Sequence, residues 1–236
     1  MQDQIVEAVM AKRRENSKAK PKAKTESKPK AAKSAAGGST DDRVIAAAMA
    51  LVAESGWRGL TLARVADASG VALADLLIPF PTKYHIVNAF QDRIDARMLR
   101  VAGLGGCGGD TRDRLFDLLM ERLDALAPYK PAMAEIAKES LRDPGALCFV
   151  PRMARSMTRA LEAAGVPGGG LMGLAKAKAL VLIYADAFRV WLKDDRPDQS
   201  KTMAALDRGL RRAETAAVRL DALRRRATKG NGARRA

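Results

Sequence analysis

From residue 41 onward, apolar residues recur three and four positions apart, a spacing that places them on one face of a helix. Ile45, Met49 and Val52 form one such stripe, and Leu206 and Leu210 belong to another. No stretch alternates apolar and polar residues at any length, as a half-buried strand would. A composition rich in Ala and Leu, with only 4% aromatic residues, also favours helices packed on helices. The sequence therefore predicts an all-α protein of about nine helices, at about residues 41–56, 61–68, 72–78, 82–98, 111–127, 131–141, 150–164, 171–194 and 199–226.

The net charge of +15 is concentrated in the two ends of the chain. Residues 1–40 carry ten Lys/Arg against four acids, and residues 218–236 carry seven against one, whereas residues 41–217 are nearly balanced, with twenty-five against twenty-two. Few large apolar side chains occur in the first segment, so we expect residues 1–40 to be a disordered basic arm and residues 218–236 a basic helical end and tail. Such ends attract polyanions, either nucleic acid or an anionic membrane surface.

Several classes of protein are disfavoured. Two cysteines, Cys107 and Cys148, do not make a disulfide framework or a metal site, and we expect reduced thiols in a cytoplasmic protein. The N-terminus shows no signal-peptide pattern. The most apolar run, residues 179–192, contains two charged residues and is shorter than the ~20 residues of a membrane span. With a single histidine, His85, and no catalytic or nucleotide-binding motif, we expect a non-catalytic protein with no metal or cofactor site.

Turn and cap residues indicate where the helices begin and end. Thr40 and Asp41 suit the start of the first helix, Gly56 its end, and Asp198 the start of the last helix. A tight turn at residues 68–71 separates two short helices, which is the pattern of a helix-turn-helix. Glycines then concentrate in residues 103–109, which we interpret as a linker because no strand precedes them and no GK[ST] sequence follows.

A distinctive set of residues surrounds this helix-turn-helix, namely Gly56-Trp57, Leu60-Thr61-Leu62, Val65-Ala66, Ala68-Ser69-Gly70-Val71, Leu76 and Phe80-Pro81-Thr82-Lys83. With these residues, the helix-turn-helix and its surroundings resemble the N-terminal domain of the TetR family over about sixty residues. This resemblance implies a three-helix DNA-binding domain at residues 41–100, whose fourth helix leads to a larger helical domain for ligand binding and dimerisation at residues 110–217.

The helix that should read DNA departs from the family pattern. Residues 72–79 offer Ala72, Leu73, Ala74, Asp75, Leu77, Ile78 and Pro79 where family members place hydroxyl, basic and aromatic side chains. None of these can make a bidentate base contact, and Asp75 has the wrong charge for a phosphate. Thr61, Arg64 and Lys83 match positions that contact the DNA backbone in the family. If the protein nevertheless binds DNA in the manner of the family, the candidate DNA contacts are Thr61, Arg64, Leu73, Asp75 and Lys83.

A second set of residues is spread over residues 111–216, namely Leu115-Phe116, Arg122-Leu123, Leu126-Ala127-Pro128-Tyr129, Met157, Leu161 to Gly165, Tyr184, Trp191-Leu192, Asp194-Asp195-Arg196-Pro197-Asp198, Thr202, Leu206-Asp207 and Arg211. With these residues, this part of the chain resembles the C-terminal domain of the coenzyme Q (ubiquinone) biosynthesis accessory family, which has a TetR-type fold. The resemblance implies an apolar pocket for a lipid or quinone intermediate, and assistance to biosynthetic enzymes rather than catalysis.

Apolar side chains on helices expected to face one another make a candidate pocket for such a ligand. The same residues could instead fill a core, or line the inducer pocket of a TetR regulator. The candidates are Leu118, Leu119, Met153, Met157, Leu161, Leu180, Ile183, Tyr184, Phe188 and Trp191.

The last predicted helix carries one apolar seam, which suits packing on its own domain or on a twin subunit up to about residue 217. Beyond that point arginines lie beside apolar residues, a combination typical of a helix on an anionic membrane surface. The candidate membrane surface is Val218, Leu220, Leu223, Arg224, Arg225 and Arg226.

Two hypotheses for the function follow. The first is a non-catalytic accessory protein of ubiquinone biosynthesis with a degenerate recognition helix, which binds an isoprenoid quinone or phospholipid, a partner enzyme and the inner face of the membrane. The second is a TetR-type transcriptional repressor, a homodimer that binds DNA and a small apolar ligand. The two hypotheses differ in the role that they give to residues 72–79.

Overall fold

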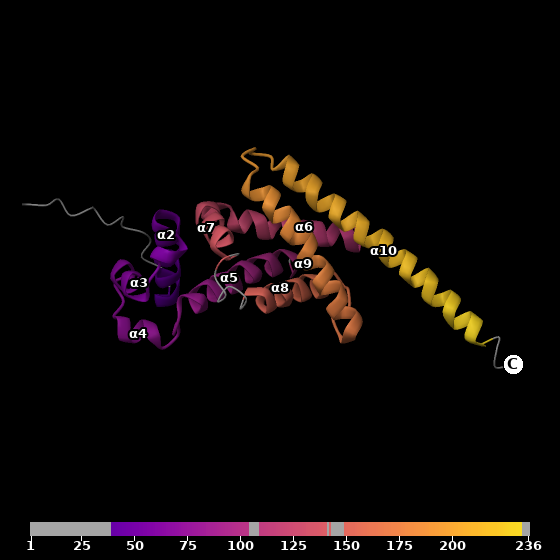
Figure 1. The fold of residues 1–236 in the computed structure, drawn as a ribbon, viewed down its shortest axis with the longest axis horizontal. Helices are drawn as coiled ribbons and strands as arrows, with labels where there is room; N and C mark the ends of the chain where they lie inside the picture. Colours follow the sequence, from indigo (N-terminus) through magenta and orange to yellow (C-terminus); the bar gives the residue numbers. More distant parts are fainter. Residues whose placement is uncertain (1–38, 104–108, 141, 143–148, 233–236) are drawn as a thin grey trace, which may run out of the picture. The chain divides into compact units, whose positions relative to one another are not determined.

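A computed structural model describes residues 39–103, 109–140, 142 and 149–232, with side chains described as far as residue 219 except at residue 101. The described residues are helical and contain no strand, which confirms the predicted all-α class (Figure 1). The elements are α2 (Thr40–Gly59), α3 (Leu62–Ser69), α4 (Leu73–Leu77), α5 (Lys83–Gly103), α6 (Thr111–Leu126), the 3₁₀ turn η1 (Ala127–Tyr129), α7 (Lys130–Ser140), α8 (Phe149–Ala163), α9 (Gly170–Leu192) and α10 (Ser200–Gly232). Of the predicted basic arm, residues 1–40, residues 1–38 lie outside the described residues.

The start of α2 differs by one residue from the prediction. Ser39 is the N-cap, and it forms a capping box in which its hydroxyl accepts from the backbone N–H of Asp42 while the Asp42 carboxylate accepts from Ser39. Gly56 does interrupt the helix, with φ at +72°, but one further helical turn follows and ends at Gly59. Only glycine adopts such a φ without strain, so this residue fixes the direction in which Trp57 enters the core.

The predicted helix-turn-helix is formed by α3 and α4. Thr61 caps α3, and Gly70 ends it in the left-handed region at φ +66°, where the next backbone N–H, of Val71, bonds back to Ala66. Leu76 of α4 is buried and belongs to the same apolar core as Val65, Ala66 and Phe80.

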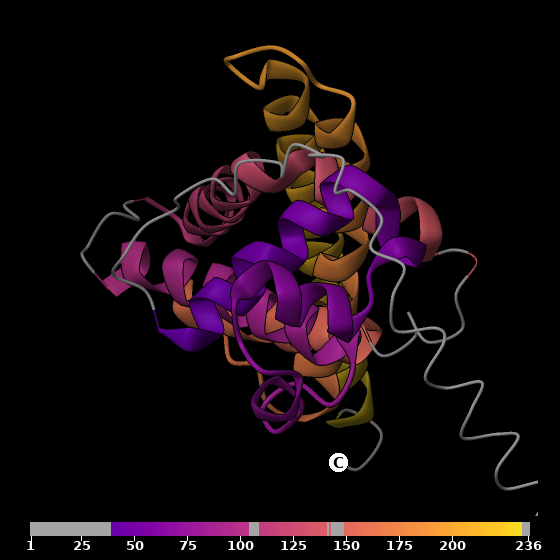
Figure 2. The ribbon, with the colours of Figure 1, turned by 90° about the vertical axis from the view of Figure 1, so that its left-hand side faces the viewer.

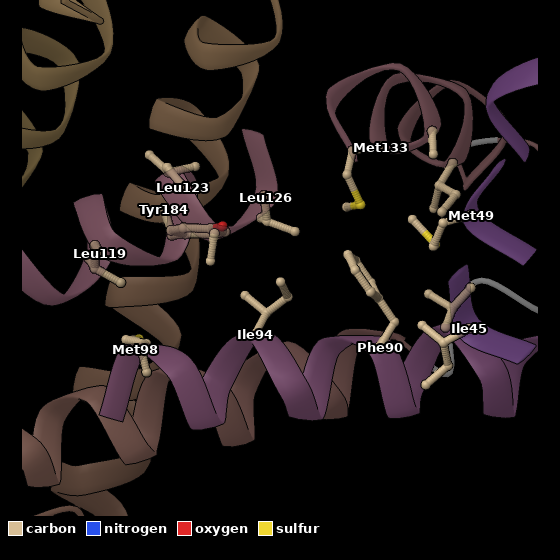
Figure 3. Packing of buried hydrophobic residues seen from close by; sticks show 14 of the residues in the cluster. Ile45, Met49, Phe90, Ile94, Met98, Leu119, Leu123, Leu126, Met133 and Tyr184 are labelled. Atoms are coloured by element: carbon tan, nitrogen blue, oxygen red, sulfur yellow. The ribbon is translucent and has the colours of Figure 1, made fainter. Parts of the chain in front are cut away.

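Helix α5 connects the helix-turn-helix part (α2 to α4) to the rear helices (α6 to α10), since it packs on α2 as well as on α6 and α8. α7 lies against α2, and α9 packs between α8 and α10 (Figures 1 and 2). Figure 3 shows Ile45 and Met49 of α2 beside Phe90 of α5 and Met133 of α7. The apolar core therefore runs from the helix-turn-helix into the rear helices without a break.

The acidic turn between α9 and α10 has a structural role. Asp194, rather than Asp198 alone, holds the first turn of α10, because its carboxylate accepts hydrogen bonds from the backbone N–H (3.0 Å) and the hydroxyl (2.9 Å) of Thr202. Burial opposes the charge, but these two bonds, together with a bond from the backbone N–H of Arg196 and the charge of Lys201, hold the pKa of Asp194 below its ordinary value. Asp198 accepts a weaker bond from the N–H of Ser200 at 3.2 Å.

Candidate functional site

The exposed surface of α4 is apolar. Leu73 and Leu77 are 41% and 42% exposed, and Ile78, directly after the helix, is 82% exposed. Asp75 is the charged residue of this helix and is also exposed. A surface that reads base edges presents hydrogen-bond donors and acceptors, and aliphatic side chains supply neither. The structure thus places Leu73 and Asp75 on the outer surface, but gives them no chemistry for direct readout.

The three polar candidates for DNA contact take part in bonds within the protein. The hydroxyl of Thr61 accepts from the backbone N–H of Arg64 at 3.3 Å. Arg64 donates from Nη1 to the carbonyl of Gly59 (2.7 Å) and the hydroxyl of Ser55 (2.8 Å), although the residue remains exposed. Lys83 donates from Nζ to the Trp57 carbonyl at 3.1 Å and lies 4.2 Å from the centre of its ring. These side chains fasten α2 to α3 and α5.

The charge of this region gives little attraction to nucleic acid. Residues 40–85 carry four Lys/Arg against five Asp/Glu, a formal charge of −1. Attraction between a protein and duplex DNA comes mainly from cations placed against phosphates. Positive charge near the helix-turn-helix therefore has to come from outside these residues, and the basic residues 1–38 are the nearest source in the sequence.

A cavity of about 140 Å³ lies between α5, α6, α7, α8 and α9. Its wall combines apolar side chains with a group of buried polar ones. The lining residues are Val87, Gln91, Arg122, Leu126, Met133, Ile136, Ala137, Ser140, Phe149, Arg152, Met153, Ser156, Tyr184 and Phe188.

The predicted pocket residues are divided among three places. Met153, Tyr184 and Phe188 line this cavity. A second hollow, of about 360 Å³ between α6, α8, α9 and α10, is lined by Leu161, Leu180 and Ile183. The other four candidates, Leu118, Leu119, Met157 and Trp191, are buried in the packed core and line neither space.

The polar part of the cavity wall is a network centred on the buried carboxylate of Asp95. Arg122 pairs with its Oδ1, while Arg152 (2.8 Å) and the hydroxyl of Ser156 (2.7 Å) donate to its Oδ2. Arg122 also donates from Nη2 to the side-chain oxygen of Gln91 at 2.5 Å. At the edge of the network, Arg159 reaches the same Oδ2 at 3.2 Å.

Burial and charge act in opposite directions on these groups. Desolvation raises the pKa of Asp95, but the attraction of Arg122, the bond from Ser156 and the attraction of Arg152 outweigh it, so the pKa lies below the ordinary value. For Tyr184, desolvation dominates and raises the pKa, although the charge of Arg122 opposes it. At neutral pH, Asp95 is ionised and Tyr184 keeps its proton.

Sequence reasoning missed most of this cavity, namely Gln91, Arg122, Arg152 and Ser156. A usable signal was present for Arg122, because it stands in an otherwise apolar helical stripe. It follows Leu118 and Leu119 at helical spacing. A polar residue in a stripe that is expected to be buried indicates a site more strongly than one more apolar residue does.

The candidate membrane surface falls almost entirely on residues whose side chains are not described. Val218 is 65% exposed, whereas the side chains of Leu220, Leu223, Arg224, Arg225 and Arg226 lie outside the described residues. Within the part of the chain that is described, no helix is long and apolar enough to cross a bilayer. The same residues hold no group of three His, Cys, Asp or Glu side chains that could bind a metal ion.

No protein-family model matches the chain, and no curated protein matches it. Among solved structures, it is similar to the TetR transcriptional regulator from Nitrosomonas europaea ATCC 19718, with 26% identity and a TM-score of 0.63, over 75% of this chain and 99% of that chain. It is also similar to a TetR transcriptional regulator from Rhodococcus sp. RHA1, with 20% identity and a TM-score of 0.52, over 72% and 93% of the two chains. The resemblance to the ubiquinone accessory family gains no support from these neighbours. The chain has a TetR-like fold.

Proposed function

We propose that this protein is a ligand-responsive transcriptional regulator of the TetR type. The observation that carries the proposal is the likeness to the Nitrosomonas regulator, which extends over 99% of that chain and so includes both the helix-turn-helix and the rear helices. A protein that shares both parts has the means to bind DNA with one and a small molecule with the other. The ligand site is the cavity of about 140 Å³.

A cluster of three aromatic rings links the cavity to the helix-turn-helix. Phe149 lines the cavity, and its ring lies 6.2 Å from that of Trp57 and 5.8 Å from that of Tyr84. Trp57 is held by Lys83, which begins α5 directly after the helix-turn-helix. A ligand that displaces Phe149 therefore pushes on the two helix ends that carry α3 and α4. Such a shift between packed arrangements is a recognised route from an effector site to a distant surface.

The apolar surface of α4 limits how this protein would bind DNA. We infer that phosphate contacts supply most of the affinity, from the basic residues 1–38 and from Arg64, which stays exposed while it bonds to Gly59 and Ser55. Binding of this kind is steeply salt-dependent, and its selectivity for a discrete site comes from the sequence-dependent shape of the DNA instead of from base contacts by α4.

A dimer would place two such surfaces on one DNA. Helices α9 and α10 expose large apolar side chains, among them Leu171 (84%) and Leu182 (72%), as a subunit interface requires. In a two-fold dimer, the two α4 helices would sit about 34 Å apart, one turn of DNA.

The test is to select bound fragments from a sheared library of the source genome with the full-length protein at about 0.15 M salt. Recovery of a discrete fragment that retains its binding against excess unrelated duplex would support the regulator. If unrelated duplex competes away all binding, the proposal fails. A variant with Arg64→Ala provides a control, since it removes one exposed cation and is expected to weaken binding to every fragment equally.

A second candidate function is favoured by the outer surface of α4. Its exposed aliphatic side chains, together with the charge of −1 over residues 40–85, suit contact with a protein or lipid better than contact with DNA. This is what the ubiquinone accessory hypothesis expects, with a bound quinone or phospholipid, a partner enzyme and a membrane surface. Solvent extraction of the purified protein followed by mass spectrometry tests it, because a carrier retains near-stoichiometric lipid and an empty protein contradicts it.

A further inference from the structure

The polar network beside the cavity is not balanced in charge. Two arginines are almost completely buried, Arg122 at 1% and Arg152 at 4% side-chain exposure, against one buried carboxylate, Asp95 at 1%. The two remaining members, Arg159 and Asp92, are half-exposed at the solvent edge, where Asp92 lies 2.8 Å from Arg152 and 3.3 Å from Arg159. The three arginines and two aspartates of the network therefore carry one positive charge in excess, and two of the three arginines lie in a buried, mainly apolar setting. Burying such a charge is costly unless an anion accompanies it.

Three hydrogen-bond donors of the cavity wall are also unused. Nε of Arg122, Nε of Arg152 and the hydroxyl of Tyr184 are buried and have no hydrogen-bond partner among the described residues. All three residues line the cavity, and Tyr184 is only 2% exposed. In the view of Figure 3, its hydroxyl oxygen lies on the side of the ring toward Leu126, another lining residue. Buried donors are almost always satisfied, so three unused ones around one space indicate an absent acceptor.

The rest of the wall sets the shape and the polarity of the molecule that carries this acceptor. Met133, Ile136, Phe149 and Phe188 provide an apolar surface next to the donors. The volume of about 140 Å³ is close to that of an engineered cavity of about 150 Å³ that holds benzene. It therefore suits an apolar body of one ring or a short alkyl chain. A single excess charge matches a carboxylate better than the double charge of a phosphate monoester.

We propose that this cavity binds a small amphipathic monoanion, an ionised carboxylic acid with a one-ring or short-chain apolar body. Arg122, Arg152 and the Tyr184 hydroxyl donate to the carboxylate, while Phe149 and its apolar neighbours enclose the body. Charge-assisted bonds of this kind are short and strong in a dry site. The inference names the ligand class for the effector site of the proposed function and rests on it for its biological meaning.

The experiment is calorimetric titration of the full-length protein at pH 7 with four probes in matched pairs. Hexanoate is compared with hexanamide, and benzoate with benzamide, so that each pair shares its apolar body and differs only in charge. We expect at least one carboxylate to bind at least tenfold more tightly than its amide. A preference for the carboxylate of less than about tenfold in both pairs, or no binding of any probe up to about 10 mM, overturns the proposal.

Three variants locate the carboxylate. Arg152→Gln removes a buried cation that lines the cavity, and we expect it to weaken carboxylate binding about tenfold or more. Arg159→Gln removes the same charge from the same network but does not line the cavity, and it is expected to leave the affinity within about twofold. Tyr184→Phe removes one hydroxyl without disturbing any ion pair, and we expect a loss of about threefold to tenfold. Because Tyr184→Phe keeps the network intact, an unchanged affinity in that variant contradicts the assigned site even if Arg152→Gln fails to fold.

The outcomes for the ligand and for the regulator are separable, since the titrations contain no DNA. A protein that binds carboxylates and no discrete DNA fragment refutes the proposed regulator and leaves the ligand class standing. A protein that binds a discrete fragment and none of the four probes refutes the ligand class alone.

Discussion

Replacing Asp95 by Asn is expected to destabilise the protein far more than replacing Asp92, only three residues earlier on α5. Both carboxylates accept from Arg152 at 2.8 Å, and both are approached by Arg159. They differ in surroundings, because the Asp95 side chain is 1% exposed and that of Asp92 is 56% exposed. The pair of substitutions thus changes one charge in the same network, once in the core and once at the surface.

The expected magnitudes follow from this difference in burial. Removing one partner of a buried ion pair leaves an uncompensated charge and costs about 3–5 kcal/mol. Here Arg122 and Arg152 both lose their buried counter-charge, and the isosteric change leaves no void to add to the cost. An exposed ion pair contributes about 0–1 kcal/mol. The free energy of unfolding should therefore fall by at least about 2 kcal/mol more for Asp95→Asn than for Asp92→Asn.

Urea unfolding followed by circular dichroism at pH 7 measures both variants. Protein concentration is held equal, because association between subunits would shift the midpoint. Equal slopes with different midpoints would attribute the change to the native state. If the two unfolding free energies agree within about 1 kcal/mol, the burial argument is refuted. The charge imbalance beside the cavity would then have no energetic consequence.

Four further predictions concern the pH dependence at Asp95 and three positions on or next to other helices. Because the pKa of Asp95 is lower in the folded protein than in the unfolded chain, where it is about 3.9, the ionised carboxylate stabilises the fold above that pH. This stabilisation is lost as the pH falls through the folded pKa, so urea midpoints below pH 4 should decline less in Asp95→Asn than in the native chain. Leu182→Asp, at a 72% exposed position on α9, should halve the molar mass in light scattering without loss of helicity if α9 and α10 form the subunit interface. Gly209→Ala should lower the melting temperature, since a Cβ there would lie 2.6 Å from Ile183. This clash outweighs the stabilisation of about 1 kcal/mol that Gly→Ala usually brings to a helix. The double variant with Ile183→Ala should recover part of the lost melting temperature. Ile78→Arg should tighten binding to any duplex and steepen its salt dependence by about one unit, with no change in melting temperature; unchanged DNA affinity would show that α4 does not face DNA.

Helices and turns were predictable from the sequence because their causes are local. The stripe of Ile45, Met49 and Val52 fixes which face of α2 is buried, and all three are buried in the structure. Gly70 adopts the left-handed conformation that a tight turn between two helices requires. Such features involve residues at most four positions apart, so a single sequence contains all the information that they need.

The cavity was not predictable in the same way, because its contacts join distant parts of the chain. Asp95 meets Arg122 across 27 positions and Arg152 across 57, and no periodicity connects those positions. The apolar pocket candidates identified helices that do surround the cavity, but position within a helix decides whether a residue lines the space or fills the core. Tyr184 and Trp191, two turns apart on α9, illustrate this, since the first lines the cavity and the second packs beneath Lys130. The acidic turn before α10, which the resemblance to the ubiquinone accessory family includes, has a local structural role, because Asp194 accepts two hydrogen bonds from Thr202.

The short distance between the cavity and the helix-turn-helix bears on either proposed function. Gln91 lines the cavity and Lys83 begins the same helix, eight residues away, so the two lie about 12 Å apart along α5 at a rise of ~1.5 Å per residue. A bound carboxylate that draws Arg122 away from Gln91 would act on α5 within about two helical turns of Lys83 and its bond to Trp57. This coupling depends on α5 and Phe149, and not on the side chains of α4. Whatever surface α4 contacts, we therefore expect a molecule in the cavity to affect how that helix is presented.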